Sequence, residues 1–176
     1  MKRTDRKSFC PINFSLETFG DPWSLLIVRD IVYFGKHTYK EFLASEERIT
    51  TSVLADRLES LQNHGILKKV RNTTDKRKEI YTLTDKGLDL IPVLLEMANW
   101  GVRFNPEGTP PVDWIARVID DRESMVKLVR DTVRKGGAVF VGPNSVIAKL
   151  AIHRKVSRRV RPTGATGLSR VRASAR

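Results

Sequence analysis

Residues 50–83 place the tightest limit on the fold of this chain, because they join an amphipathic helix directly to a basic hairpin. Thr50 can cap the helix, and Gly65 can end it in the left-handed conformation. The helix carries leucines along one face at helical spacing (Leu54, Leu58 and Leu61). Two β-like runs follow, residues 66–70 and 79–83, and the polar, basic segment between them is typical of a hairpin tip.

Two further helices are predicted at the start of the chain. A proline in the first turn favours a helix over residues 11–19, with Cys10 at the N-cap. Asp21, again followed by a proline, gives a second start signal. Residues 23–34 are apolar on almost every side, so we expect them to form the central, buried helix.

A capping box links these helices to the amphipathic one. Thr38 and Glu41 have the Thr-x-x-Glu spacing that starts a helix, here a short one ending near Ala44. Short helices followed by a basic hairpin predict a mainly α fold with a small two-stranded β-wing. This is a winged helix-turn-helix, in which the second helix of the helix-turn-helix enters the DNA major groove.

A long apolar helix is predicted after the hairpin. Thr84 can cap it, it should run to about Trp100, and Pro92 should kink it. Its apolar residues cover more than one stripe, which predicts contact with a second copy of the chain as well as with its own domain.

The remainder divides into an extension and a tail. Residues 114–135 are predicted to be helical in one or two pieces, and residues 138–141 are compatible with a short strand. We expect a winged helix-turn-helix and dimerisation domain over residues 1–104. A linker with a C-terminal helical extension should cover residues 105–136, and residues 137–176 should form a basic, largely disordered tail.

The net charge of +12 is concentrated at the C-terminal end. Residues 1–111 hold 17 Lys and Arg against 15 Asp and Glu, whereas residues 149–176 hold nine basic residues and no acidic one. The high isoelectric point therefore says little about the folded part, and DNA binding has to be argued from motifs. An architectural protein that binds nucleic acid without sequence preference through this tail is the alternative function.

Candidate DNA-contacting residues follow from the two expected elements. Arg can read guanine through two hydrogen bonds, Ser and Thr can meet bases or phosphates, and a basic wing tip suits phosphates. The candidates lie at the starts of the two helices, on the outer face of the second helix and at the wing tip (Thr38, Thr50, Thr51, Ser52, Arg57, Lys76, Arg77 and Lys78). Asp56 and Glu59 would repel phosphate, so we expect them to form ion pairs with basic side chains such as Arg57.

The same stretches resemble the HxlR-type winged-helix transcriptional regulators. The matching segments run in order along the chain (residues 10–12, 20–30, 36–43, 49–58, 75–87 and 90–96, with Trp100). The resemblance extends to about residue 135 and departs after Gly136. It implies a bacterial homodimer whose first and last helices pack against the partner. We expect such a dimer to bind double-stranded DNA at a pseudo-palindromic operator.

Cys10 has two interpretations. A thiol at a helix N-cap beside Arg6 and Lys7 would be favoured as the thiolate, which is how reactive cysteines arise. The resemblance adds that some family members sense oxidants or electrophiles through this cysteine. The alternative is a small residue buried at the dimer interface.

Other classes of protein are not expected. One cysteine and three scattered histidines make no metal site, and no phosphate-binding loop or nucleophile motif indicates an enzyme or a cofactor. No apolar run approaches the ~20 residues that span a bilayer, and the first residues do not form a secretory signal. We therefore expect a cytoplasmic protein without a membrane partner, with a small-molecule or oxidant effector left open.

Overall fold

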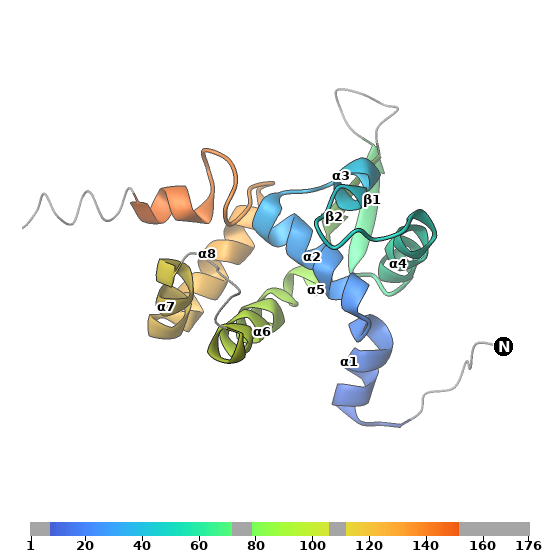
Figure 1. The fold of residues 1–176 in the computed structure, drawn as a ribbon, viewed down its shortest axis with the longest axis horizontal. Helices are drawn as coiled ribbons and strands as arrows, with labels where there is room; N and C mark the ends of the chain where they lie inside the picture. The colour runs from blue at the N-terminus through green and yellow to red at the C-terminus, as the bar shows by residue number, and fades with distance from the viewer. Residues whose placement is uncertain (1–7, 72–78, 106–111, 152–176) are drawn as a thin grey trace, which may run out of the picture.

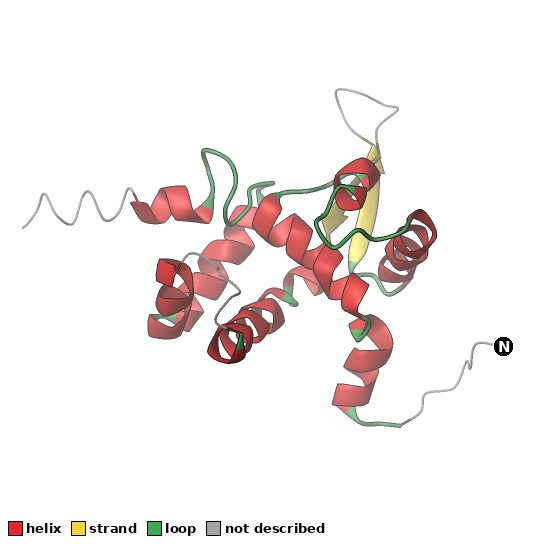
Figure 2. Cartoon of the chain, viewed as in Figure 1, coloured by secondary structure: helices red, strands yellow, loops and turns green. Residues whose placement is uncertain are grey.

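The computed structural model describes residues 8–71, 79–105 and 112–151 (Figure 1). Eight labelled helices and one two-stranded sheet follow each other in these ranges, and a last helical segment covers residues 146–151 (α1 Pro11–Phe19, α2 Pro22–Phe34, α3 Tyr39–Leu43, α4 Thr51–Asn63, β1 Leu67–Arg71, β2 Glu79–Leu83, α5 Asp85–Leu88, α6 Ile91–Phe104, α7 Val112–Asp120 and α8 Arg122–Arg134). The mainly helical fold with a two-stranded wing is confirmed (Figure 2).

Helix α2 is the centre of the molecule, as its apolar sequence predicts. It contacts α1, α4, α6, α8 and β2, and the side chains of Val28 and Val32 are completely buried. Asp21 starts α2 by accepting hydrogen bonds from the amides of Trp23 and Ser24, each at 3.0 Å. Gly35 ends it at φ +63°, a left-handed conformation that favours glycine.

The helix-turn-helix and the wing also form where the sequence places them. Thr38 begins α3 with the expected capping box, and Thr50 begins α4. Gly65 has φ +67° and turns the chain from α4 into β1, which starts one residue later than expected. The strands pair antiparallel, with Leu67 opposite Leu83, and β1 lies against α4 (Figure 1).

The single kinked helix expected after the wing is instead two helices. Thr84 caps only the short α5, and the chain turns at Asp89 and Leu90 before α6 begins. Pro92 lies in the first turn of α6. A first-turn residue has no helical acceptor for its amide, so a proline costs nothing there and starts a new helix rather than kinking an old one.

The C-terminal extension forms two helices, α7 and α8, and α8 packs on α2, α5 and α6. Three ion pairs run along α8 to the α5–α6 segment: Arg134 with Asp85 at 2.6 Å, Arg122 with Glu96 at 2.5 Å, and Arg130 with Asp89. The extension is therefore attached along α8 to the two helices that follow the wing.

The folded region continues past the expected boundary at residue 136. The amides of Val139 and Phe140 donate to the carbonyls of Val32 and Tyr33 at 2.9 and 3.0 Å, although these residues do not form a strand. Val139 and Val146 are completely buried, and residues 146–151 are helical. The disorder expected from residue 137 is therefore wrong for residues 137–151, because their apolar side chains complete the core beside α2. Residues 152–176 lie outside the described part.

Candidate nucleic-acid interface

The first turn of α4 presents small polar side chains to solvent. Thr51 and Ser52 are exposed, while Leu54, Leu58 and Leu61 on the opposite face are buried. Thr50 is exposed too, but its hydroxyl accepts from the Val53 amide at 3.4 Å and so has a capping role. The Tyr39 hydroxyl donates to the Thr51 carbonyl at 2.9 Å and fixes the start of α4 against α3.

Thr38 has a structural task as well. Its hydroxyl accepts from the Glu41 amide at 3.3 Å, and the Glu41 carboxylate accepts from the amides of His37 and Thr38, both at 2.8 Å. Partial burial would raise the pKa of Glu41, but these hydrogen bonds outweigh it and lower the pKa below its ordinary value. The capping box thus fixes the direction in which α3 leaves α2.

Arg57 does not point away from the domain as the sequence suggests. Its guanidinium donates to Asp21 at 3.3 Å, and both side chains are about 30% exposed, at 31% and 28%. The pair joins the middle of α4 to the N-terminus of α2. The expected pairing of Asp56 and Glu59 with Arg57 is absent among the described residues, and both acids are exposed on the outer face of α4.

A polar network that the sequence did not reveal holds the turn before α4. Asp30, on α2, is almost fully buried and accepts hydrogen bonds from Arg29, Lys36 and Ser45. Arg29 also binds Glu47 with two hydrogen bonds, and these bonds lower the pKa of Glu47 to about 2. In the sequence, the only sign of this network is an aspartate inside an apolar helix. A buried carboxylate is stable only when it is paired, so such a residue indicates partners from elsewhere in the chain.

Two exposed basic residues near this turn are not among those that the sequence predicted to contact DNA. Lys40 lies on α3, and Arg48 lies two residues before the α4 cap. Arg48 has φ +55°, a left-handed conformation that a residue other than glycine adopts at a cost of about 1 kcal/mol or more. This backbone state turns the chain sharply into α4.

The wing is basic in its described part. Lys68, Lys69 and Arg71 are exposed on β1, and Lys69 pairs with Glu79 across the sheet at 2.6 Å. The predicted tip residues Lys76, Arg77 and Lys78 lie outside the described residues.

Cys10 is the exposed N-cap of α1, and its side chain makes no capping hydrogen bond. The basic neighbours Arg6 and Lys7 lie outside the described residues.

Apolar side chains are exposed on α1 and on the second half of α6. Ile12 and Leu16 of α1 are 69% and 61% exposed, and Trp100 and Phe104 of α6 are 66% and 68% exposed. The rings of Trp100 and Phe104 also contact each other at a tilt, with centroids 5.0 Å apart. Such clusters are typical of surfaces that are covered by a partner.

Comparison with known proteins supports the class of fold. The family model described as HxlR-like helix-turn-helix matches residues 18–109, just over half of the chain, and the chain belongs to this family. An uncharacterised HTH-type transcriptional regulator of Mycobacterium tuberculosis is 33% identical over 98 residues, which are 54% of this chain and 61% of that protein. The chain thus spans about three fifths of the length of this relative.

Two further similarities agree with this assignment. The HTH-type transcriptional regulator YodB of Bacillus subtilis is 30% identical over 102 residues, covering 57% of this chain and 90% of YodB. The crystal structure of PA1607, described as a candidate transcription factor, superposes with a TM-score of 0.53 at 34% identity, covering 61% of this chain and 71% of PA1607.

Two features are absent from the described residues. None of their helices is long and apolar enough to cross a membrane. They also contain no group of three or more His, Cys, Asp or Glu side chains that could hold a metal ion.

Proposed function

We propose that this protein is a transcriptional regulator that binds a pseudo-palindromic DNA operator as a homodimer. The observation that carries the proposal is the first turn of α4. It exposes Thr51 and Ser52 beside a basic wing, and the network around Asp30 fixes the turn that leads into it. Sequence readout requires side chains held in a fixed geometry at the entrance to the major groove.

The dimer follows from the exposed apolar surface on α1 and α6. Isolated apolar residues on a surface need no explanation, but aromatic and aliphatic side chains clustered on two helices do. Two copies related by a two-fold axis would present two α4 helices to the two halves of a palindrome.

The test is a selection of bound duplexes from a random library, followed by titration of the selected duplex and a scrambled one at several salt concentrations. We expect operator binding to be tighter by about 1,000-fold or more, with the stoichiometry of two chains per duplex. Equal affinity for both duplexes would support the alternative, a non-specific binder that acts through its basic tail.

Ser52→Glu separates DNA binding from folding. A carboxylate in the first turn of a helix is favourable to the helix dipole, so the variant should fold normally. It should lose operator binding, because the charge would face phosphates and base edges. Ser124→Glu is the matched control, because Ser124 is exposed in the first turn of α8 and should leave DNA binding unchanged.

Regulation by thiol chemistry is a second part of the proposal, supported by the exposure of Cys10 at the start of an apolar helix. Alkylation with N-ethylmaleimide or oxidation with diamide should change operator affinity in the parent protein. The variant Cys10→Ser should bind DNA equally well before and after either treatment. An identical response of parent and variant would remove Cys10 from the mechanism.

A further inference from the structure

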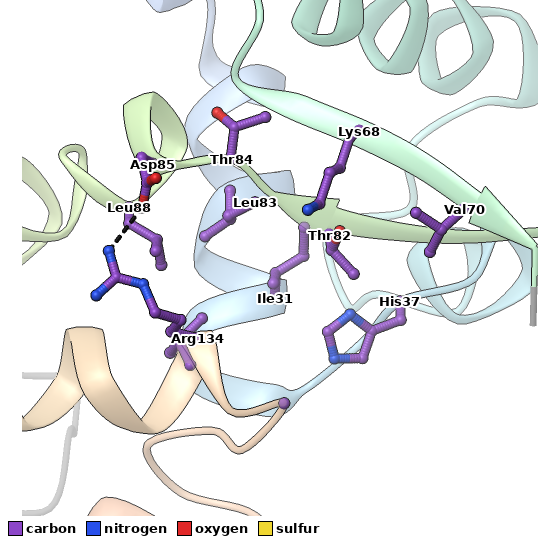
Figure 3. A pocket seen from close by; sticks show the side chains of 12 residues that line it. Ile31, His37, Lys68, Val70, Thr82, Leu83, Thr84, Asp85, Leu88 and Arg134 are labelled. Carbon is purple, nitrogen blue, oxygen red and sulfur yellow. Dashed lines mark hydrogen bonds and ion pairs between the residues drawn. The ribbon is translucent and has the colours of Figure 1, made fainter.

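A cavity of about 450 Å³ lies between the wing and the C-terminal extension, away from the first turn of α4 (Figure 3). Its apolar lining comes from α2, β2, α5 and α8 (Ile31, Leu83, Leu88 and Val133). All four of these side chains are buried, which makes the lining a fixed surface rather than a set of mobile side chains. Volumes of this size are typical of small-molecule sites.

Three groups that can carry positive charge converge on the cavity from different elements. Figure 3 shows Lys68 from β1, His37 from the α2–α3 connection and Arg134 from α8 around the apolar lining. Arg134 is paired with Asp85 at 2.6 Å, whereas no ion pair joins Lys68 to a described carboxylate. The hydrogen bond from Arg134 lowers the pKa of Asp85, so these two lining groups offset each other's charge and Lys68 is left as the cation for an anionic ligand.

One hydrogen bond fixes the orientation of the His37 ring beside the cavity. Its Nδ1 lies 2.9 Å from the Tyr81 carbonyl oxygen, and a carbonyl can only accept, so Nδ1 carries a hydrogen. This bond fixes the ring beside the cavity and leaves Nε2 for another group.

The Thr82 hydroxyl supplies a second, independent sign of a ligand. Its oxygen is buried and has no hydrogen-bond partner among the described residues, although Thr82 lines the cavity. A buried hydroxyl without a partner destabilises the fold by about 1–3 kcal/mol. A rotation of the Thr82 side chain about χ1 would bring this buried hydroxyl to an oxygen-bearing ligand in the cavity.

We propose that this cavity binds a small organic carboxylate with an apolar, ring-sized body. The carboxylate would meet Lys68 and Thr82, and the ring would lie on the buried apolar lining. Such a ligand would touch the wing and α8 at once, and it would add negative charge beside the basic wing. Its binding should therefore weaken the attraction of the wing to DNA phosphates. This last consequence rests on the proposed DNA-binding function, whereas the binding site does not.

The direct test is an NMR titration of the full chain with 1-naphthoate. The backbone amide resonances of Thr82 and Gly136 are monitored during the titration. We expect saturable shifts with a Kd of about 1 mM or tighter, the affinity that about 13 non-hydrogen atoms ordinarily reach. The uncharged isostere 1-naphthamide should bind at least ~10-fold more weakly, because it cannot form the charge-assisted contacts. Equal binding of the two compounds, or no saturable shift with naphthoate, would overturn the proposal.

Two variants and one control locate the site. Lys68→Gln should weaken naphthoate binding about 10-fold. Thr82→Val should weaken it about 3-fold or more without lowering the melting temperature, because it removes a hydroxyl that has no hydrogen-bond partner in the part of the chain that the structure describes. Lys69→Gln is the control, because the neighbouring Lys69 pairs with Glu79 and does not line the cavity. Unchanged binding in both Lys68→Gln and Thr82→Val would place the ligand elsewhere.

The consequence for DNA is measured separately. Saturating 1-naphthoate should raise the Kd for the selected operator about 5-fold or more in the parent protein and have no such effect in Lys68→Gln. An unchanged operator Kd with naphthoate bound would overturn the coupling. A protein that binds no operator at all would instead count against the proposed function, since the naphthoate titration contains no DNA.

Discussion

At the scale of single residues, the partner of Arg57 decides what this side chain can do. The ion pair with Asp21 connects positions 36 residues apart in the sequence and holds α4 against the N-terminus of α2. An arginine committed to such a pair must leave it before it can reach a base. We therefore expect Arg57 to act on DNA binding mainly through the placement of α4.

A double-mutant cycle tests this role. Arg57→Gln and Asp21→Asn should each lower the free energy of unfolding by about 0.5–1 kcal/mol, and their effects should be non-additive by a similar amount. Asn is chosen because it preserves the α2 N-cap. Urea unfolding gives these values. If Arg57→Gln changes the preferred operator without changing stability, the side chain reads a base instead.

Glu47 makes stability depend on pH. Its pKa of about 2 in the folded protein is below the ordinary value of 4.5, because Arg29 binds the carboxylate. A depressed folded-state pKa contributes stability that is complete above pH 4.5 and is lost as the pH falls toward 2. The carboxylate is about a third exposed, so solvent screening limits the contribution to the order of 1 kcal/mol.

The measurement compares the parent protein with Glu47→Gln by urea unfolding between pH 3 and pH 7. The parent should be more stable by a constant amount above about pH 5, and the difference should shrink at lower pH. A difference that stays constant across the whole range would show that the Arg29–Glu47 pair does not carry it.

At the scale of elements, the two halves of α6 have different surroundings. Its first half packs into the core, where Leu94 and Leu95 are buried, and its second half exposes Met97, Trp100 and Phe104. Substitution of Leu94 would therefore damage the fold itself, and only the second half can report on association.

Met97→Glu combined with Trp100→Glu should convert the dimer to a folded monomer and reduce operator binding about 100-fold or more, because one α4 then reads one half-site. Sedimentation velocity and circular dichroism measure the two properties. Ile119→Glu on α7 is the control, since Ile119 is also an exposed apolar residue, at 58%, but lies outside α1 and α6. A dimer that survives the double substitution would place the interface elsewhere.

At the scale of the whole molecule, the last 40 residues divide into two segments with different expected roles. Residues 137–151 close the core beside α2, and residues 152–176 add eight basic residues and no acidic one. The first part should matter for stability, and the second for long-range attraction to DNA.

Two truncations separate these parts. Ending the chain after residue 151 should leave the melting temperature and the preferred operator unchanged but weaken binding to random DNA and reduce its salt dependence. Ending it after Gly136 should lower the free energy of unfolding by about 3 kcal/mol or more, because the buried Val139 and Val146 are lost. Equal stability of the two truncated chains would show that residues 137–151 contribute no core.

The sequence alone determined the local architecture of this protein. The caps at Asp21, Thr38 and Thr50, the left-handed turn at Gly65 and the leucine face of α4 all depend on residues within a few positions of one another. Local hydrogen bonds and helical spacing decide such features wherever the segment packs, and they were sufficient to predict the winged helix-turn-helix.

Only the tertiary structure decided which distant groups meet. The partner of Arg57, the buried network at Asp30, the core contribution of residues 137–151 and the cavity beside Lys68 each join segments that are remote in the chain. The break before α6 belongs here too, because a proline is compatible with a kink or with a first turn. Burial and pairing depend on how helices pack, and no pattern within one segment specifies its neighbour.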